Sequence, residues 1–114
     1  MPKTDELQSL LSREKDIVTR KTNCELQIKK YRKLKEEQLV HSCQQQKWME
    51  SVLEDFRQSR YQHELTFINE DLLKVNQRLV STYDEEIEKL QNDLQKYNRQ
   101  LKDIHKHRKD TKNQ

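Results

Sequence analysis

The sequence contains no glycine and no alanine, and its single proline is Pro2. Glycine supplies the positive φ angles of tight turns and phosphate-binding loops, so its absence excludes hairpin-rich β folds, P-loops and dinucleotide fingerprints. Leu, Ile, Val and Phe make up about 23% of the 114 residues while 38% are charged, and highly charged chains below roughly 20% of these residues stay disordered. The composition leaves helix or disorder, and a compact globular core is not expected.

Long apolar runs are also missing, since no seven consecutive residues are hydrophobic. This excludes a signal-peptide core and a membrane span, and we expect a cytoplasmic or nuclear protein. Cys24 and Cys43 fit that expectation as reduced thiols, because 19 residues of straight helix would hold them roughly 28 Å apart, beyond disulfide reach.

Hydrophobic residues nevertheless recur with a regular period in the C-terminal half. Alternating steps of four and three residues define a C-terminal seam, in which Ile87 takes heptad position a: Tyr83, Ile87, Leu90, Leu94, Tyr97, Leu101 and Ile104. A second series with the same steps lies upstream, in a frame shifted by one residue, and is named the displaced stripe: Leu65, Ile68, Leu72, Val75 and Leu79. Such heptads are typical of coiled coils, and both series are predicted to face a partner helix.

The N-terminal half has a weaker seam. It includes Leu7, Leu10, Ile17, Cys24, Ile28 and Tyr31 only if the charged residues Glu14 and Lys21 share the same row. We divide the chain into a weakly heptad segment over residues 1–46, an aromatic-rich coiled-coil segment over 47–80, a strong heptad segment over 81–104 and a basic, frayed tail over 105–114.

The predicted fold class is all-α, an elongated coiled coil formed by one long helix or by an open helical pair. A break near 81–84 is the alternative to one helix, because Thr82 and Glu85 have the spacing of a capping box. A single helix of about 110 residues would be roughly 165 Å long and could not bury its own stripe. The stripe must therefore meet another helix, either in a partner or by folding back.

The seam residues also bear on the kind of partner. Tyr83 and Tyr97 occupy d positions, where identical parallel chains would set phenol against phenol, and the flanks of the C-terminal seam are acidic or neutral. A partner chain with a basic flank would gain more from ion pairs. We expect other coiled-coil chains as partners, in a hetero-oligomer in preference to a parallel homodimer.

Aromatic residues cluster in the centre of the chain. Such side chains dominate interface hot spots, so they are a candidate aromatic anchor, with ordinary seam packing as the alternative: Trp48, Phe56, Tyr61 and Phe67.

Net charge is distributed in blocks of +3 over residues 1–60, −5 over 61–95 and +5 over 96–114. The blocks suit staggered or antiparallel pairing. Two basic runs are candidate polyanion contacts, with a solvated helix face as the alternative: Lys29, Lys30, Arg32, Lys33, Lys35, Lys106, Arg108 and Lys109. A helical adaptor that binds nucleic acid nonspecifically is therefore the second functional hypothesis.

Catalysis is not predicted, because none of the four histidines is part of a nucleophile constellation. His105 and His107 are two residues apart, so a helix points them about 200° from each other, and the cysteines lack zinc-site spacing. We predict no catalytic residue, metal site or cofactor. The sequence favours a noncatalytic structural subunit or scaffold.

Overall fold

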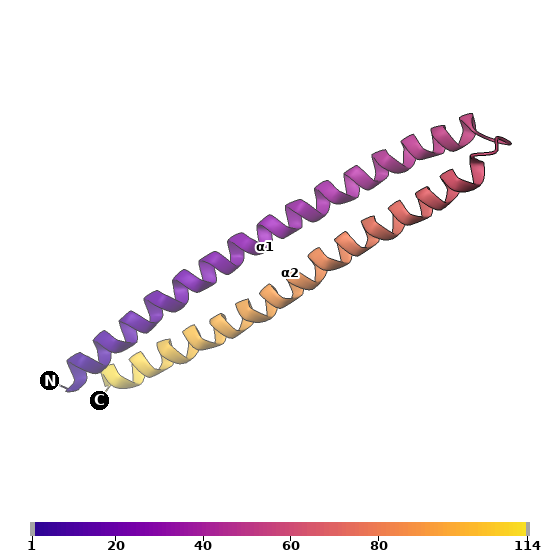
Figure 1. Cartoon of the computed structure of the whole chain (residues 1–114). Coiled ribbons are helices and arrows are strands. Elements are labelled where there is room, and N and C mark those ends of the chain that lie inside the picture. The colour runs from indigo at the N-terminus through magenta and orange to yellow at the C-terminus, as the bar shows by residue number, and fades with distance from the viewer. Residues whose placement is uncertain (1, 114) are drawn as a thin grey trace. The chain divides into compact units, whose positions relative to one another are not determined.

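The computed structural model describes residues 2–113, with side chains from Thr4 onward. It contains two long helices, α1 (Pro2–Asp55) and α2 (Gln62–Asn113), and no strand over residues 2–113 (Figure 1). The predicted all-α class is confirmed, and of its two alternatives the chain forms the helical pair, so the alternative of one long helix is wrong. Strong helix formers such as Glu, Gln, Lys, Leu and Arg fill both helices, which agrees with their intrinsic propensities.

The break between the helices lies at residues 56–61, so the alternative of a break near 81–84 is wrong. Thr82 lies inside α2, where its hydroxyl donates a 2.8 Å hydrogen bond to the carbonyl of Arg78, four residues earlier. A threonine in the interior of a helix commonly makes this bond. Thr82 is therefore not an N-cap.

The connecting loop turns without glycine or proline. Gln58 adopts a positive φ of 67°, and its backbone N–H donates to Oε1 of Gln62 at 3.0 Å. The backbone N–H of Ser59 donates to the carbonyl of Phe56 at 2.9 Å, and Ser59 Oγ accepts a 3.2 Å bond from the N–H of Tyr61. These bonds satisfy backbone groups that the helix ends leave unpaired.

Contacts divide the chain into two units, each of which pairs part of α1 with part of α2. Unit 1 comprises residues 1–29 and 88–114. Within it the two segments run antiparallel, because Glu6 contacts His107 and Cys24 contacts Leu90. The core of unit 1 consists of three buried residues with two half-buried ones against them: Leu10, Ile17 and Ile104 with Tyr97 and Leu101.

Unit 2 comprises residues 30–87, which form a helical hairpin around the loop. The Tyr31 and Tyr83 rings lie across from each other with centroids 6.2 Å apart. Its buried hydrophobic residues are Met49 and Ile87. Unit 2 thus has fewer buried hydrophobic residues than unit 1, where Leu10, Ile17, Cys24, Ile28 and Ile104 are buried.

Over the residues described, neither helix has a stretch long and apolar enough to cross a membrane.

Candidate functional site

The interior of unit 1 contains charged residues in the positions that the weak N-terminal seam requires. Ile17 and Cys24 are buried in α1, and Glu14 and Lys21 are half-buried in the same row. Glu14 Oε1 lies 3.2 Å from Nε2 of His105, and its other carboxylate oxygen accepts a hydrogen bond from Arg108. Acidic side chains near the start of α1 thus pair with the basic end of α2.

These contacts determine the electrostatics of Glu14. The hydrogen bond to His105 is the main cause that lowers the pKa of the Glu14 carboxyl, and the charge of Arg108 lowers it further, against a partial desolvation that raises it. Hydrogen bonds to the charged form of a carboxylate have this effect. Glu14 is therefore held in its ionised form.

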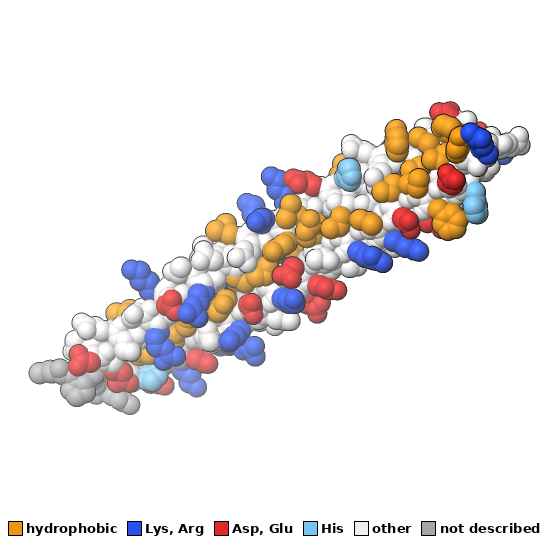
Figure 2. Space-filling view, in the orientation of Figure 1, with side chains coloured by type: hydrophobic (Ala, Val, Ile, Leu, Met, Phe, Trp, Pro, Cys, Tyr) orange, Lys and Arg blue, Asp and Glu red, His pale blue; other side chains and the backbone are white. Residues whose placement is uncertain are grey.

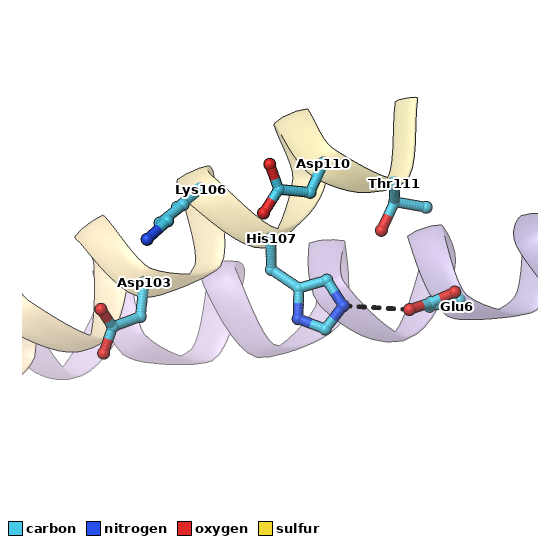
Figure 3. Close-up of a pocket in the computed structure, with 6 residues that line it drawn as sticks. All are labelled: Glu6, Asp103, Lys106, His107, Asp110 and Thr111. Carbon is cyan, nitrogen blue, oxygen red and sulfur yellow. Dashed lines mark hydrogen bonds and ion pairs between the residues drawn. The ribbon is translucent and has the colours of Figure 1, made fainter. Parts of the chain in front are cut away.

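A polar pocket lies beside this contact, lined by Glu6, Asp103, Lys106, His107, Asp110 and Thr111 (Figure 3). His107 points toward Glu6 of α1, and its Nε2 is 3.0 Å from Oε1 of that residue. His105 and His107 thus contact different carboxylates, and among the described residues no group of three His, Cys, Asp or Glu side chains is arranged to hold a metal ion. The contact between His107 and Glu6 links the two helix ends of unit 1 at this pocket.

Cys24 lies in the interhelical interior of unit 1. It is 5% exposed, and its thiol donates a 3.0 Å hydrogen bond to the carbonyl of Leu90. Burial raises the pKa of this thiol, and the charges of Asp93 and Glu25 raise it further. Both Cys24 and Cys43 are free thiols, and Cys24 acts as a small buried hydrophobic residue.

The C-terminal seam of α2 faces α1 within the chain. Ile104 is buried in unit 1 and Ile87 in unit 2, and the other five members are half-buried: Tyr83, Leu90, Leu94, Tyr97 and Leu101. Lys35 of α1 contacts Asp84 of α2 at 2.6 Å. The basic flank that we expected from a partner chain is thus provided, at this position, by the chain itself.

The displaced stripe lies differently. Ile68, Val75 and Leu79 are 49%, 50% and 38% exposed, and Leu65 and Leu72 are half-buried at its edge. The one-residue shift of frame turns the stripe sideways, because each residue of an α-helix rotates by about 100°. This segment of α2 therefore buries its hydrophobic face only in part, and the row of Ile68 and Val75 stays exposed.

Polar side chains, and not the displaced stripe, lie between the two helices of unit 2. They were not predicted from the sequence. Gln38 donates a 2.8 Å hydrogen bond to Oδ1 of Asn76, and Asn76 donates a 2.8 Å bond to Oε1 of Gln45. The signal was available, because Asn69 and Asn76 continue the seven-residue row of Tyr83 toward the N-terminus of α2. Buried amides fix the register of paired helices at a cost in stability.

The four residues of the aromatic anchor surround the loop of unit 2. Trp48 in α1 and Phe67 in α2 are 62% and 55% exposed, and Phe56 and Tyr61, in the loop, are 42% and 44% exposed. The Phe67 ring packs edge-on against the His63 ring at 5.0 Å. No residue of this set is buried within the chain.

The exposed hydrophobic residues are concentrated in unit 2. Of the large hydrophobic side chains described as exposed, all but Leu11, Val18 and Leu26 belong to residues 30–87. Figure 2 shows hydrophobic side chains gathered near the loop. A groove on unit 2 adds to this surface, lined by Leu39, Ser42, Leu73, Asn76, Gln77, Val80 and Ser81. Exposed patches of this kind mark interaction sites in soluble proteins.

No family model, curated protein or solved structure matches this chain. Its function must therefore be argued from the surface that the two units present.

The predicted polyanion contacts are only partly available for a ligand. Lys35 and Arg108 pair with carboxylates of the same unit. The others are exposed on the helices: Lys29, Lys30, Arg32, Lys33, Lys106 and Lys109. Polyanion binding stays a prediction. Six of the eight basic side chains, and not all eight, would be available for it.

Proposed function

We propose that this chain is a noncatalytic structural subunit or scaffold of the cytoplasm or nucleus, which assembles with other helical chains through coiled-coil packing. One observation carries the proposal: the displaced stripe has heptad spacing but leaves Ile68, Val75 and Leu79 exposed on a helix that is already formed. Burying apolar surface stabilises association by about 25 cal/mol per Å². A second helix packed along the stripe would gain this free energy.

The interior of unit 2 supports the same proposal. A hairpin that half-buries the amides of Gln38, Gln45 and Asn76 while it exposes aliphatic side chains gives up part of the hydrophobic stabilisation that its composition allows. Burying the stripe against another helix would recover it. The aromatic anchor around the loop extends the same exposed surface and is proposed to contribute hot-spot contacts.

The preference for a hetero-oligomer over a parallel homodimer stays a prediction, and its basis has changed. It rested on the tyrosines and acidic flanks of the C-terminal seam, which α1 covers within each unit. The choice of partner now depends on the displaced stripe.

Site-specific photo-crosslinking tests the proposed function. A photoreactive residue at Val75, in the full chain expressed in its native cells, should form adducts whose partner peptide has heptad hydrophobic spacing. The matched control is a photoreactive residue at Leu26, which is 60% exposed in unit 1 and should form none. The absence of adducts at Val75, or equal adducts at both positions, would contradict the proposal.

Salt separates this function from the adaptor hypothesis. Binding to nucleic acid or another polyanion weakens steeply between low and physiological ionic strength because counterions are released. Coiled-coil assembly through aliphatic side chains should change only modestly.

A further inference from the structure

The displaced stripe is a row of hydrophobic side chains on which a second helix could pack. Its five side chains follow alternating steps of three and four residues from Leu65 to Leu79, which corresponds to about 21 Å along the helix axis. Because α2 is already helical over this range, a second helix that docks here does not depend on forming a new helix nucleus on this side.

We infer that the displaced stripe binds the displaced stripe of a second copy of this chain, with the two α2 helices antiparallel and related by a two-fold axis. The inference rests on the proposed function and names the partner of its surface. Two unit 2 hairpins joined in this way form a four-helix arrangement with the stripes at its centre.

The spacing of the stripe suits pairing with itself. The steps 3, 4, 3, 4 read as 4, 3, 4, 3 from the other end, so an antiparallel copy presents the same kind of seam. Two antiparallel registers, one heptad apart, place the leucine row of one copy level with the row of Ile68 and Val75 of the other. In the first register Leu72 lies level with Val75 of the second copy. In the second register it lies level with Ile68 of the second copy.

In each register four layers contain only aliphatic side chains, as a coiled-coil seam requires. The fifth stripe residue lies level with a different side chain of the second copy: Leu65 with Thr82 in the first register, and Leu79 with Tyr61 in the second.

Charges beside the stripe favour the antiparallel orientation. Glu64, Asp71 and Arg78 immediately precede the three leucines of the stripe, lie on one flank and are exposed. An antiparallel copy sets Arg78 beside Asp71 of the second copy in the first register and beside Glu64 in the second, and the two-fold axis makes each pair twice. Acidic residues also meet on this flank: Glu64 lies beside Glu85 of the second copy in the first register, and Asp71 lies beside Asp71 in the second.

A parallel copy would set this flank against the opposite flank of the stripe, where the neutral Asn69 and Asn76 lie. In the second register the two Arg78 pairs outnumber the single contact between the Asp71 side chains, so charge favours the antiparallel orientation there.

Light scattering and sedimentation velocity on the full chain test the inference. The chain should pass from a monomer of 14.0 kDa to a dimer of twice that mass as its concentration rises from roughly 1 to 300 μM, the range expected for a small interface. Val75→Glu should raise the dissociation constant by at least about 100-fold, because each dimer would bury two unpaired charges. Leu26→Glu is the matched control and should dimerise like the original chain. Circular dichroism should show equal helix content in all three, because both sites are at least 50% exposed.

The charge pairs have their own test. Arg78→Glu should weaken the dimer by about tenfold, since it replaces two attractive contacts with two repulsive ones. Lys74→Glu changes a neighbouring exposed charge that does not lie on this flank and should have a smaller effect.

Cross-linking determines the orientation. In a Cys43→Ser background, chains with Leu65→Cys are mixed with chains with Leu79→Cys and treated with a short bismaleimide. In both registers these positions lie within about 6 Å of each other along the axis, whereas Leu79 is at least about 16 Å from Leu79 of the second copy. The mixture should therefore cross-link and the Leu79→Cys chain alone should not. The reverse result would show a parallel pair and overturn the inference.

Failure of this inference can be told apart from failure of the proposed function. A chain that stays at 14.0 kDa throughout the concentration series, or a dimer that Val75→Glu leaves intact, overturns self-association through the stripe. The proposed function would still stand if photo-crosslinking at Val75 gave adducts with a different helical chain. Without such adducts both proposals are wrong.

Discussion

Two alanine substitutions in α2 test which face of this helix the chain buries. Ile104 is 4% exposed in the core of unit 1, where Leu10 and Ile17 surround it, whereas Val75 of the displaced stripe is 50% exposed. Both belong to heptad series of the same sequence quality. Sequence periodicity alone predicts a similar loss of unfolding free energy for the two substitutions. The structure predicts a larger loss at the buried position, Ile104, than at Val75.

The expected costs follow from the carbon atoms that each substitution removes from a buried position. Ile104→Ala removes three, worth about 2.4 kcal/mol at about 0.8 kcal/mol each, and the higher helix propensity of alanine returns about 0.4 kcal/mol. Val75→Ala removes two carbon atoms, but about half of their surface is already exposed, so the lost burial is worth about 0.8 kcal/mol. The higher helix propensity of alanine returns about 0.5 kcal/mol. The net destabilisation is about 2 kcal/mol for Ile104→Ala and about 0.3 kcal/mol for Val75→Ala.

Urea unfolding followed by circular dichroism at 222 nm measures both values. The protein concentration must lie below that of any self-association, so that only contacts within one chain contribute. Equal losses of unfolding free energy for the two variants, or a loss below about 0.5 kcal/mol for Ile104→Ala, would refute the burial described for α2.

Three further predictions concern single groups. Because hydrogen bonding lowers the pKa of Glu14 below its ordinary value of 4.5, the stabilisation from its ionised form is complete above pH 4.5 and is lost as the pH falls through the lower folded-state pKa; Glu14→Gln should remove this part of the acid sensitivity in melting curves. Iodoacetamide should alkylate Cys43 well before Cys24, whose buried thiol has a raised pKa, and equal rates by mass spectrometry would contradict its burial. Replacing Trp48 and Phe56 together by alanine should abolish partner binding and leave helix content nearly unchanged, whereas a uniform loss of helicity would show that these residues only stabilise the hairpin.

The fold class and the polar seam could be read from the sequence because both depend on local periodicity. Glu14 and Lys21 lie where the N-terminal row requires them, half-buried against α2, and the absence of glycine correctly excluded β structure. The charge blocks did not predict this pairing, because Glu14 and Arg108, which contact each other, both lie in blocks of net positive charge.

The position of the turn could not be predicted from local signals. The loop at 56–61 lacks glycine and proline, and its one positive φ belongs to Gln58, a residue with no preference for that conformation. The capping spacing at Thr82 was a stronger local signal and was misleading. The turn is favoured because it brings the weak seam of α1 opposite the C-terminal seam of α2, which is a long-range effect.

The exposure of the displaced stripe was not predicted either, because its own spacing does not show which face of α2 turns toward α1. Its spacing is as regular as that of the C-terminal seam, and only the seven-residue row through Asn69, Asn76 and Tyr83 reveals which face turns toward α1. Both frames cannot face the same helix. The structure places the polar frame in the interior of unit 2 and leaves Ile68, Val75 and Leu79 of the apolar frame exposed.

Thiol labelling at Val75 tests most directly whether the displaced stripe is a helix-binding surface. The chain with Val75→Cys and Cys43→Ser is labelled with a maleimide in its native assembly and again as a dilute isolated chain, with Leu26→Cys as the control. Position 75 should react at least about tenfold more slowly in the assembly, because burial under a second helix excludes the reagent, while position 26 should react equally in both. Equal labelling of position 75 in the two states would contradict it.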